Sequence, residues 1–274
     1  MPRRCAVLGQ PIAHSLSPVL HRAAYAELGL DWSYDAIEVG SPDLAGFLGT
    51  LAADWRGLSL TMPLKRTVIP LLSSQDDWTR LSGVANTVVI DDGALRGYNT
   101  DIPGAVDALR RHLGGPVARV VVLGGGATAV SVLLAAAELG CESATLLVRD
   151  PSRAVETLDV VGRHPRAPQL DVQTLDGPPV RADLVISTVP ATAQTPELLA
   201  RVAAVPAVFE VVYYPWPTPL AAAARASGRV LVPGLDMLVG QAALQVSLMT
   251  GRDDIPVAAM RAAGEQALAE RSRP

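Results

Sequence analysis

The stretch that decides the fold runs from residue 118 to residue 129 and reads ARVVVLGGGATA. An apolar strand-forming run is followed at once by a glycine turn and by the start of an alanine-rich helix. The spacing Gly124-x-Gly126-x-x-Ala129 fits the dinucleotide-binding fingerprint, in which the glycines allow a tight turn close to a pyrophosphate and a small third residue packs helix on strand. The order strand, glycine turn, helix therefore predicts a Rossmann-type unit.

The glycine turn and the helix start are the predicted phosphate site, because the first N–H groups of a helix are free to bind anions. We expect cofactor contacts from Gly124, Gly125, Gly126, Ala127 and Thr128. The tip of the next strand selects the cofactor, and Arg149 and Arg153 in this region suit a 2′-phosphate. The arginines favour NADP, whereas Asp150 keeps NAD open, because a carboxylate at this tip binds ribose hydroxyls.

Strand and helix patterns alternate along the rest of the chain. After the glycine turn, strand-type runs are separated by helical ones, which predicts a parallel sheet; the runs are residues 144–148, 184–188, 207–212 and 229–232. Before the turn, the predicted strands are residues 5–9, 33–39 and 57–61, the predicted helices are residues 18–28 and 44–53, and residues 86–98 form a hairpin. This first part therefore also has an open α/β layout.

Two domains follow from these patterns. A helix is expected from Asp101 to about Leu113, and the helical tail at residues 236–248 and 255–269 has apolar faces that pack back on the first domain. The predicted fold class is α/β, with an N-terminal open α/β substrate domain plus a Rossmann-type dinucleotide-binding domain. We expect the first domain to comprise residues 1–101 completed by residues 236–274, and the second to comprise residues 102–235.

The composition limits the classes of function. The chain has 274 residues, 49% of them hydrophobic, and a net charge of −4 with no basic block, which argues against a nucleic-acid footprint or a basic membrane-binding face. No apolar run approaches a membrane-spanning length and no signal-peptide core is visible, so we expect a soluble, cytoplasmic protein. Cys5 and Cys141 lack metal-type spacing and are expected to fill the core in a reducing compartment.

Lys65 is the only lysine among 23 basic residues, the rest being arginine. Arginine keeps its proton near neutral pH, whereas a lysine ammonium can release one, so the two residues differ most where a proton moves. A lysine on a surface loop needs no special explanation, and its neighbours decide between the two interpretations.

Polar residues gather at the ends of predicted strands, where open α/β sheets bind ligands. Ser15 and Ser17 stand at a strand-to-helix junction, and Ser17 before Pro18 is also typical of a helix cap. The other members of this set are Thr61, Lys65, Asn86 and Asp101. Together they predict a polar ligand site, which makes a functional interpretation of Lys65 the better one.

The sequence resembles the shikimate dehydrogenase family from Gly9 to about Gly251. The motifs that carry the resemblance are GQPIAHSLSP from residue 9, TMPLK from residue 61, VANT from residue 84, GYNTD from residue 97, VVYYP from residue 211 and PGLDMLVGQ from residue 233. The resemblance implies a two-domain oxidoreductase that reduces 3-dehydroshikimate to shikimate with NADPH, on the route to chorismate and the aromatic amino acids. The substrate contacts that it implies are Ser15, Ser17, Thr61, Lys65, Asn86, Asp101, Tyr213 and Gln241, and it places Val211 and Gly234 at the nicotinamide end of the cofactor.

The family's pattern also implies roles. Ser15 and Ser17 hold the substrate carboxylate, and Lys65 and Asp101 flank the C3 oxygen. We expect Lys65 to donate a proton to that oxygen in reduction and to accept it in oxidation, while Asp101 orients Lys65 and binds the C4 hydroxyl. The reverse assignment of these two residues stays open. Hydride transfer itself belongs to the nicotinamide.

Some positions depart from the family's pattern. Val148 and Asp150 replace the asparagine and the threonine that usually flank the cofactor arginine, which weakens the NADP assignment. Ala127 replaces a further glycine of the turn, and Glu210 replaces an aspartate that commonly precedes the tyrosine motif. None of these changes removes a group expected to be catalytic.

Two other functions remain open. An NAD-dependent quinate/shikimate dehydrogenase would differ in the space that its substrate site leaves around one carbon of the substrate ring, and the spacing of residues in the sequence does not measure that space. A non-catalytic metabolite-binding homologue would be expected to lack Lys65 or Asp101, and this chain has both.

The remaining expectations concern metals and partners. The four histidines, His14, His21, His112 and His164, form no ligand pattern, so we expect no metal. The expected partner is a small-molecule substrate, shikimate or 3-dehydroshikimate, with no nucleic acid and no membrane, and the chain is expected to be a monomer or a homodimer.

Overall fold

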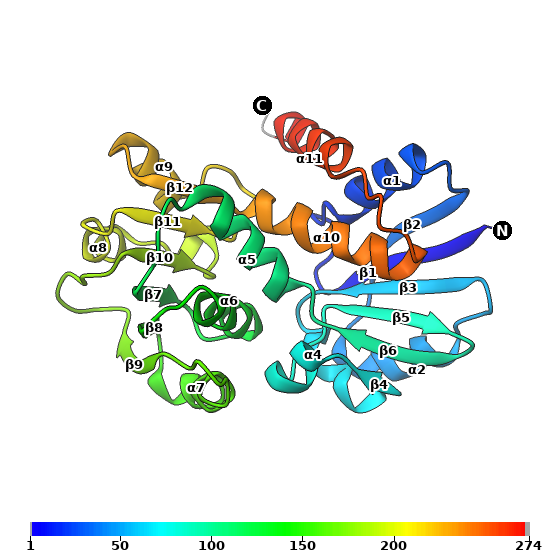
Figure 1. Ribbon diagram of the computed structural model, residues 1–274, viewed down its shortest axis with the longest axis horizontal. Coiled ribbons are helices and arrows are strands. Elements are labelled where there is room, and N and C mark those ends of the chain that lie inside the picture. Colours follow the sequence, from blue (N-terminus) through cyan, green and yellow to red (C-terminus); the bar gives the residue numbers. More distant parts are fainter. Residues whose placement is uncertain (1, 272–274) are drawn as a thin grey trace. The chain divides into compact units, whose positions relative to one another are not determined.

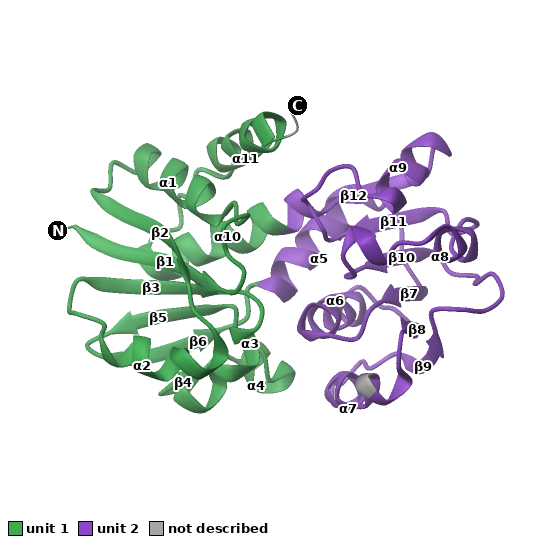
Figure 2. Cartoon of the chain, turned by 180° about the vertical axis from the view of Figure 1, so that it is seen from behind, with its two compact units in different colours: residues 1–100, 238–274 green, residues 101–237 purple. Residues whose placement is uncertain are grey.

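The computed structural model describes residues 2–271, apart from the side chain of Arg153. The chain divides into two compact units, which Figure 2 distinguishes by colour. Unit 1 comprises residues 1–100 and 238–274, and unit 2 comprises residues 101–237. The ranges expected from the sequence differ from these by one or two residues at the boundaries.

Unit 1 is built on a mixed sheet with the strand order β2-β1-β3-β5-β6-β4 (Figure 1). Its strands are β1 (Arg3–Gly9), β2 (Trp32–Glu38), β3 (Trp55–Leu60), β4 (Ser74–Gln75), β5 (Thr87–Asp91) and β6 (Ala94–Tyr98). Its helices are α1 (Ser17–Glu27), α2 (Leu44–Gly49), α3 (Leu64–Thr67), α4 (Asp77–Ser82), α11 (Val257–Arg271) and the larger part of α10 (Gly234–Thr250), with short 3-10 turns at Ser41–Asp43 and Ile69–Leu71.

Strand directions in unit 1 bring several loops to one edge of the sheet. β1 pairs in parallel with β2 and β3, whereas β5 is antiparallel to both β3 and β6. The carboxyl ends of β1, β3 and β6 and the amino end of β5 therefore share an edge. The polar motifs of unit 1 follow or precede these strand ends, which explains why residues far apart in sequence meet there.

The core of unit 1 lies where β1 and β3 are covered. Cys5 to Gly9 are buried in succession, as is typical of a central parallel strand with both faces covered. In the edge strand β2, Tyr34 is buried and the other residues are partly or fully exposed. One buried cluster contains Leu8, Leu58, Leu60 and Val88. Helices α1 and α11 pack side by side over this unit (Figure 1).

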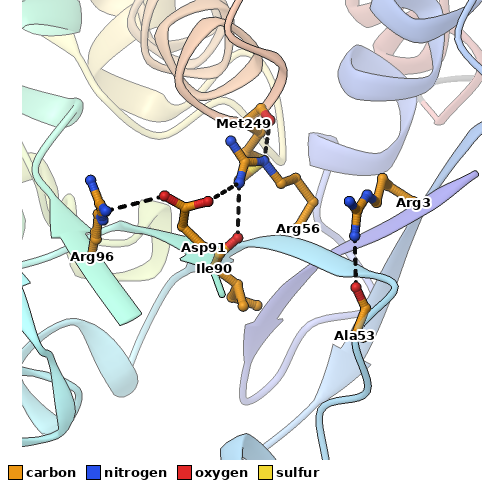
Figure 3. A network of polar contacts seen from close by, with 7 residues as sticks. All are labelled: Arg3, Ala53, Arg56, Ile90, Asp91, Arg96 and Met249. Carbon is orange, nitrogen blue, oxygen red and sulfur yellow. Dashed lines mark hydrogen bonds and ion pairs between the residues drawn. The ribbon is translucent and has the colours of Figure 1, made fainter. Parts of the chain in front are cut away.

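Arg56 ties three elements of unit 1 together, as Figure 3 shows. Its Nε donates to the carbonyl of Met249 at the end of α10 (2.7 Å), and its NH1 donates to the carbonyl of Ile90 (3.0 Å) and to Asp91 Oδ1 (3.3 Å) on β5. Asp91 also pairs with Arg96 on β6 (3.1 Å). The guanidinium thus joins β3 to the hairpin and to the end of α10.

Unit 2 has a fully parallel sheet with the order β12-β11-β10-β7-β8-β9. Its strands are β7 (Arg119–Leu123), β8 (Ser143–Val148), β9 (Gln169–Thr174), β10 (Leu184–Ser187), β11 (Ala207–Glu210) and β12 (Val230–Pro233). Its helices are α5 (Asp101–His112), α6 (Ala127–Glu138), α7 (Val155–Gly162), α8 (Pro196–Arg201) and α9 (Pro219–Ala226), with 3-10 turns at Pro151–Ala154 and Ala191–Ala193. The predicted α/β class and the Rossmann-type sheet are confirmed.

Some details differ from the sequence-based expectations. The helix expected over residues 44–53 ends at Gly49, where the hydroxyl of Thr50 donates to the carbonyl of Phe47 (2.7 Å) and the chain turns toward β3. Strands β4 and β9 were not predicted, because one has two residues and the other is a polar edge strand. No described helix is long and apolar enough to cross a membrane.

Candidate active site

The loop between β1 and α1 carries the two serines expected to bind a carboxylate. It begins at Gly9, where a Cβ atom would lie 2.3 Å from Thr61 Cγ2, so only glycine lets the two loops approach this closely. The prediction that Ser17 caps α1 is wrong: the N-cap position is Leu16, and the Ser15 hydroxyl accepts from the Ser17 N–H (3.3 Å). Ser17 is the first residue of the helix and only 6% exposed.

The α11 helix supports the same loop from the other end of the chain. Arg271 NH1 donates to the carbonyl of His14 (2.7 Å). The backbone of Ser15 is held in turn by a hydrogen bond from its N–H to the carbonyl of Ile12 (2.9 Å). The conformation of this loop is therefore fixed by its own turn and by the last helix of unit 1.

Thr61 and Lys65 lie on a turn and short helix directly after β3. The Thr61 N–H donates to the carbonyl of Leu8 (2.9 Å), and the Thr61 carbonyl accepts from the N–H of Leu64 (2.8 Å). Lys65, on α3, is half-buried, and its carbonyl accepts from the N–H of Ala85 (2.9 Å). Backbone contacts thus bring the only lysine of the chain next to the segment that carries Asn86.

Asn86 and Gln241 meet in a buried polar cluster. Asn86 Nδ2 donates to Gln241 Oε1 (3.2 Å) and to Thr100 Oγ1 (2.9 Å), while its Oδ1 accepts from the Thr100 N–H (2.9 Å). Asn86 is 1% and Gln241 6% exposed. Two implied substrate contacts that are 155 positions apart are therefore brought into direct contact within unit 1.

A hydrogen-bonded chain that the sequence did not reveal runs beneath this cluster. The Tyr34 hydroxyl donates to Ser59 Oγ (2.5 Å), which donates to Gln245 Oε1 (2.7 Å), and Gln245 Nε2 donates to Thr87 Oγ1 (3.0 Å). The chain thereby joins Tyr34 on β2 to Thr87, the neighbour of Asn86, through buried groups, which holds these side chains in fixed positions.

Asp101 and Tyr213 belong to unit 2. Asp101 is the first residue of α5 and is 5% exposed. Tyr213 is partly buried in the loop that follows β11. Asp101 lies three residues after the end of β6, and Tyr213 lies three residues after the end of β11, as the sequence predicted.

The glycine turn of unit 2 has the geometry that a phosphate site needs. Gly124 has φ +104°, and a Cβ atom there would lie 2.5 Å from Thr188 Oγ1, so the position requires glycine. Gly126 is the N-cap of α6 and makes no side-chain cap, while Gly125 is held by the Thr157 hydroxyl, which donates to its carbonyl (2.9 Å). The first N–H groups of α6, at Ala127 and Thr128, are thus left without a side-chain cap, which suits a phosphate.

The tip of β8 carries the residues expected to select the cofactor. Arg149 is exposed at this tip, on the strand next to β7 and its glycine turn. Asp150 caps the following 3-10 turn, since its Oδ1 accepts from the N–H (3.0 Å) and the hydroxyl (2.8 Å) of Ser152. The side chain of Arg153 lies outside the described part of the structure.

Val211 and Gly234 meet at the carboxyl edge of the unit 2 sheet. A Cβ atom at Gly234 would lie 2.2 Å from the carbonyl oxygen of Val211, so no other residue fits without moving the backbone. The two residues expected at the nicotinamide end of the cofactor are therefore in contact.

Other titratable groups lie outside this set. Burial raises the pKa of the Cys5 and Cys141 thiols to about 11, and both cysteines are free. His112 pairs with Asp236 (2.6 Å) and His164 with Glu138 (3.0 Å). Within residues 2–271, no three His, Cys, Asp or Glu side chains are grouped as a metal site would need; the expectation of no metal stays a prediction.

A pocket of about 420 Å³ opens at the other end of the unit 1 sheet. Arg3, Trp55 and Arg56 line it, and they stand at the starts of β1 and β3, whereas the candidate residues follow the carboxyl ends of these strands. This pocket is therefore separate from the candidate site.

The fold and the glycine turn define the class of two-unit α/β oxidoreductases with a Rossmann-type dinucleotide unit. Family models for the shikimate dehydrogenase substrate binding domain and the shikimate 5'-dehydrogenase C-terminal domain match residues 7–88 and 234–263. The NADP(+) shikimate dehydrogenase of Moorella thermoacetica is 38% identical over 93% of this chain and 90% of that protein. The chain belongs to the shikimate dehydrogenase family, as its motifs predicted.

Solved structures agree with this assignment over nearly the whole chain. The shikimate dehydrogenase of Mycobacterium tuberculosis has a TM-score of 0.86 and 36% identity, covering 97% of this chain and 100% of that one. The shikimate 5-dehydrogenase of Thermus thermophilus, solved in complex with NADP(H) and shikimate, has a TM-score of 0.84 and 32% identity over 97% of this chain and 100% of that one.

Proposed function

We propose that this protein is an NADP-dependent shikimate dehydrogenase, which reversibly reduces 3-dehydroshikimate to shikimate in aromatic amino acid biosynthesis. The observation that carries the proposal is the buried Asn86–Gln241 cluster, which lies beside the segment of Lys65. The match to the Moorella thermoacetica enzyme, which covers 90% of that protein, supports it. A polyhydroxylated ring acid needs several such donors and acceptors, because an unpaired buried polar group costs about 1–3 kcal/mol.

We assign substrate binding to the polar groups of both units. Ser15 and Ser17 hold the carboxylate, and the ring hydroxyls are bound by Thr61, Asn86, Asp101, Tyr213 and Gln241. The hydrogen-bonded chain through Tyr34 and Gln245 supports this assignment, because it fixes the side chains before a ligand arrives.

We assign proton transfer to Lys65. In reduction its ammonium donates a proton to the oxygen at C3, and in oxidation its amine takes the proton back, while Asp101 orients it and accepts from the C4 hydroxyl. An arginine in this place would keep its proton, which gives the single lysine of the chain a chemical reason. The reverse assignment, with Asp101 as the proton-transfer group, is the alternative.

The glycine turn fits NADP, whose reduced form would supply the hydride in reduction and whose oxidised form would accept it in oxidation. Gly124, Gly125, Gly126, Ala127 and Thr128 would hold the pyrophosphate, Arg149 and Arg153 the 2′-phosphate, and Val211 and Gly234 would border the nicotinamide. The exposed guanidinium of Arg149 on the strand beside the glycine turn favours NADP over NAD. We also place the protein in the cytoplasm, as a monomer or homodimer.

The test is the steady-state rate of shikimate oxidation with NADP and with NAD, for the wild type, Lys65→Ala and Lys65→Arg. We expect a strong NADP preference and a loss of about 10²-fold or more in kcat for both variants, since the arginine of Lys65→Arg keeps the positive charge but does not release a proton near neutral pH. Asp101→Asn, measured alongside, should lose less than Lys65→Ala; a greater loss would favour the reverse assignment.

Other outcomes favour the alternatives. A preference for NAD would indicate the quinate/shikimate dehydrogenase, and turnover of quinate would support it further. The absence of turnover with either cofactor would favour a metabolite-binding homologue. Lys65→Arg with wild-type kcat would contradict the proton-transfer role.

A further inference from the structure

Glu210 is a buried acid at the end of β11 for which the proposed reaction has no use. Its side chain is fully buried, yet among the described residues no ion pair reaches it. Its Oε2 accepts from Gln194 Nε2 (2.7 Å) and from the Thr218 hydroxyl (2.8 Å), and its Oε1 accepts from the N–H of Val212 (3.1 Å). Burial raises the pKa of Glu210, and these donors act in the opposite direction.

Two of these three donors, Val212 and Thr218, lie at opposite ends of the segment that carries Tyr213. Val212 is the second residue of the loop of residues 211–218. Thr218 ends this loop and caps α9, its Oγ1 accepting from the N–H of Ala221 (3.2 Å). Gln194 continues the network, because its Oε1 accepts from the N–H of Leu220 (2.9 Å). One carboxylate therefore ties the start of this loop to its end.

The loop is also fixed from the side of α10. The absence of a side chain at Gly234 lets the carbonyl of Val211 lie against the start of that helix. With Glu210 on one side and Gly234 on the other, the backbone at Val211 and Val212 has little freedom to move.

We propose that Glu210 is a positioning residue, which holds the loop of residues 211–218 so that Val211 and Tyr213 can meet the cofactor and the substrate. This role rests on the proposed function. The longer side chain matters: an aspartate would place its carboxylate about 1.5 Å nearer its own backbone, in reach of the Val212 N–H but farther from Gln194 and Thr218. The glutamate side chain at this position thus reaches all three donors.

The variants Glu210→Gln and Glu210→Asp test this role. Glu210→Gln replaces one carboxylate oxygen with an NH₂ group, which would face either the donors Gln194 and Thr218 or the donor Val212. We therefore expect at least a tenfold loss in kcat/KM for shikimate, with higher KM for shikimate and NADP. The affinity for 2′,5′-ADP, which lacks the nicotinamide, should stay within twofold of wild type. Hydrogen exchange in peptides that cover residues 211–218 should become faster. Glu210→Asp should recover part of each loss, because it restores the bond to Val212.

Glu138→Gln is the matched control, because Glu138 is the last residue of α6 and pairs with His164 and Arg166, neither of which belongs to this loop. It should leave the kinetics and the loop exchange unchanged. Wild-type kinetics in Glu210→Gln, or a loss of 2′,5′-ADP affinity that parallels the loss of kcat/KM, would overturn the positioning role. If the wild-type protein does not oxidise shikimate, the proposed function fails, and hydrogen exchange in residues 211–218 then tests the role of Glu210 by itself. Faster exchange in Glu210→Gln with intact 2′,5′-ADP binding would support the positioning role, and unchanged exchange would refute it.

Discussion

The surroundings of His21 keep its imidazole neutral. Its ring is fully buried and stacks on Tyr34 with 3.9 Å between centroids, and Nδ1 lies 2.8 Å from the carbonyl of Ser17. That carbonyl only accepts, so Nδ1 carries the proton, and Nε2 has no hydrogen-bond partner among the described residues. A second proton on Nε2 would be buried without an acceptor, and burial accordingly lowers the pKa of His21 to about 4.

This histidine should make the protein less stable in mild acid. In the unfolded chain the imidazole binds a proton below about pH 6.5, whereas in the folded protein it does so only near pH 4. The unfolded state therefore binds more protons between these values, and the free energy of unfolding should fall by about 3 kcal/mol as pH drops through this window. Urea unfolding of the wild type and of His21→Phe from pH 7 to 4 measures the difference.

The exposed His14 provides the control, since His14→Gln should keep the pH dependence of the wild type. If His21→Phe loses stability with acid as steeply as the wild type, the buried imidazole is not the cause.

At the scale of elements, Arg56 is expected to stabilise the joint between β3, the β5–β6 hairpin and α10. Its side chain is 26% exposed, and Arg56→Met would leave the carbonyls of Met249 and Ile90 without this donor. We expect a loss of about 1–3 kcal/mol in the free energy of unfolding, measured by urea denaturation. Arg80→Ala, which removes a surface pair with side chains 60% and 95% exposed, should cost under about 1 kcal/mol. Equal losses would show that Arg56 acts as an ordinary surface charge.

The elements also show how far the sequence predicts the structure. Strands such as β7 and turns such as Gly124–Gly126 were predictable, because an apolar run and a cluster of glycines are local patterns in the sequence. The positive φ of Gly124 agrees with the predicted turn. The Tyr34–Ser59–Gln245 chain was not, since Ser59 and Gln245 are 186 positions apart and neither belongs to a local pattern. The Ser17 cap was mispredicted because Ser15 supplies the hydroxyl instead. In the sequence, Glu210 stands out only because it replaces the family's usual aspartate. Its partner Gln194 is 16 positions away and could be identified only from the structure.

At the scale of the whole molecule, cofactor binding should stabilise the fold without any turnover. A ligand that binds only the folded state at 100 times its Kd adds about 2.7 kcal/mol to the free energy of unfolding. Because of Arg149 we expect NADP to raise the unfolding temperature more than NAD does at equal concentration, and Arg149→Gln should reduce the difference. Differential scanning fluorimetry measures this, and equal shifts for both nucleotides in the wild type would contradict the NADP assignment.

Helix α10 has a consequence for anyone who recombines such enzymes. Unit 2 is an insertion within unit 1, and one of its two boundaries, between Met237 and Leu238, falls inside this continuous helix of 17 residues. A chimaera that exchanged the nucleotide module at that boundary would splice two half-helices from different parents. The donor's half would keep its own contact between Gly234 and Val211, and the recipient's half would keep Gln241 and Gln245 on Asn86 and Thr87. The two halves would therefore have to join as one continuous helix without disturbing either set of contacts. Cofactor preference in this fold is therefore more readily transplanted by substituting residues at the tip of β8 than by shuffling modules.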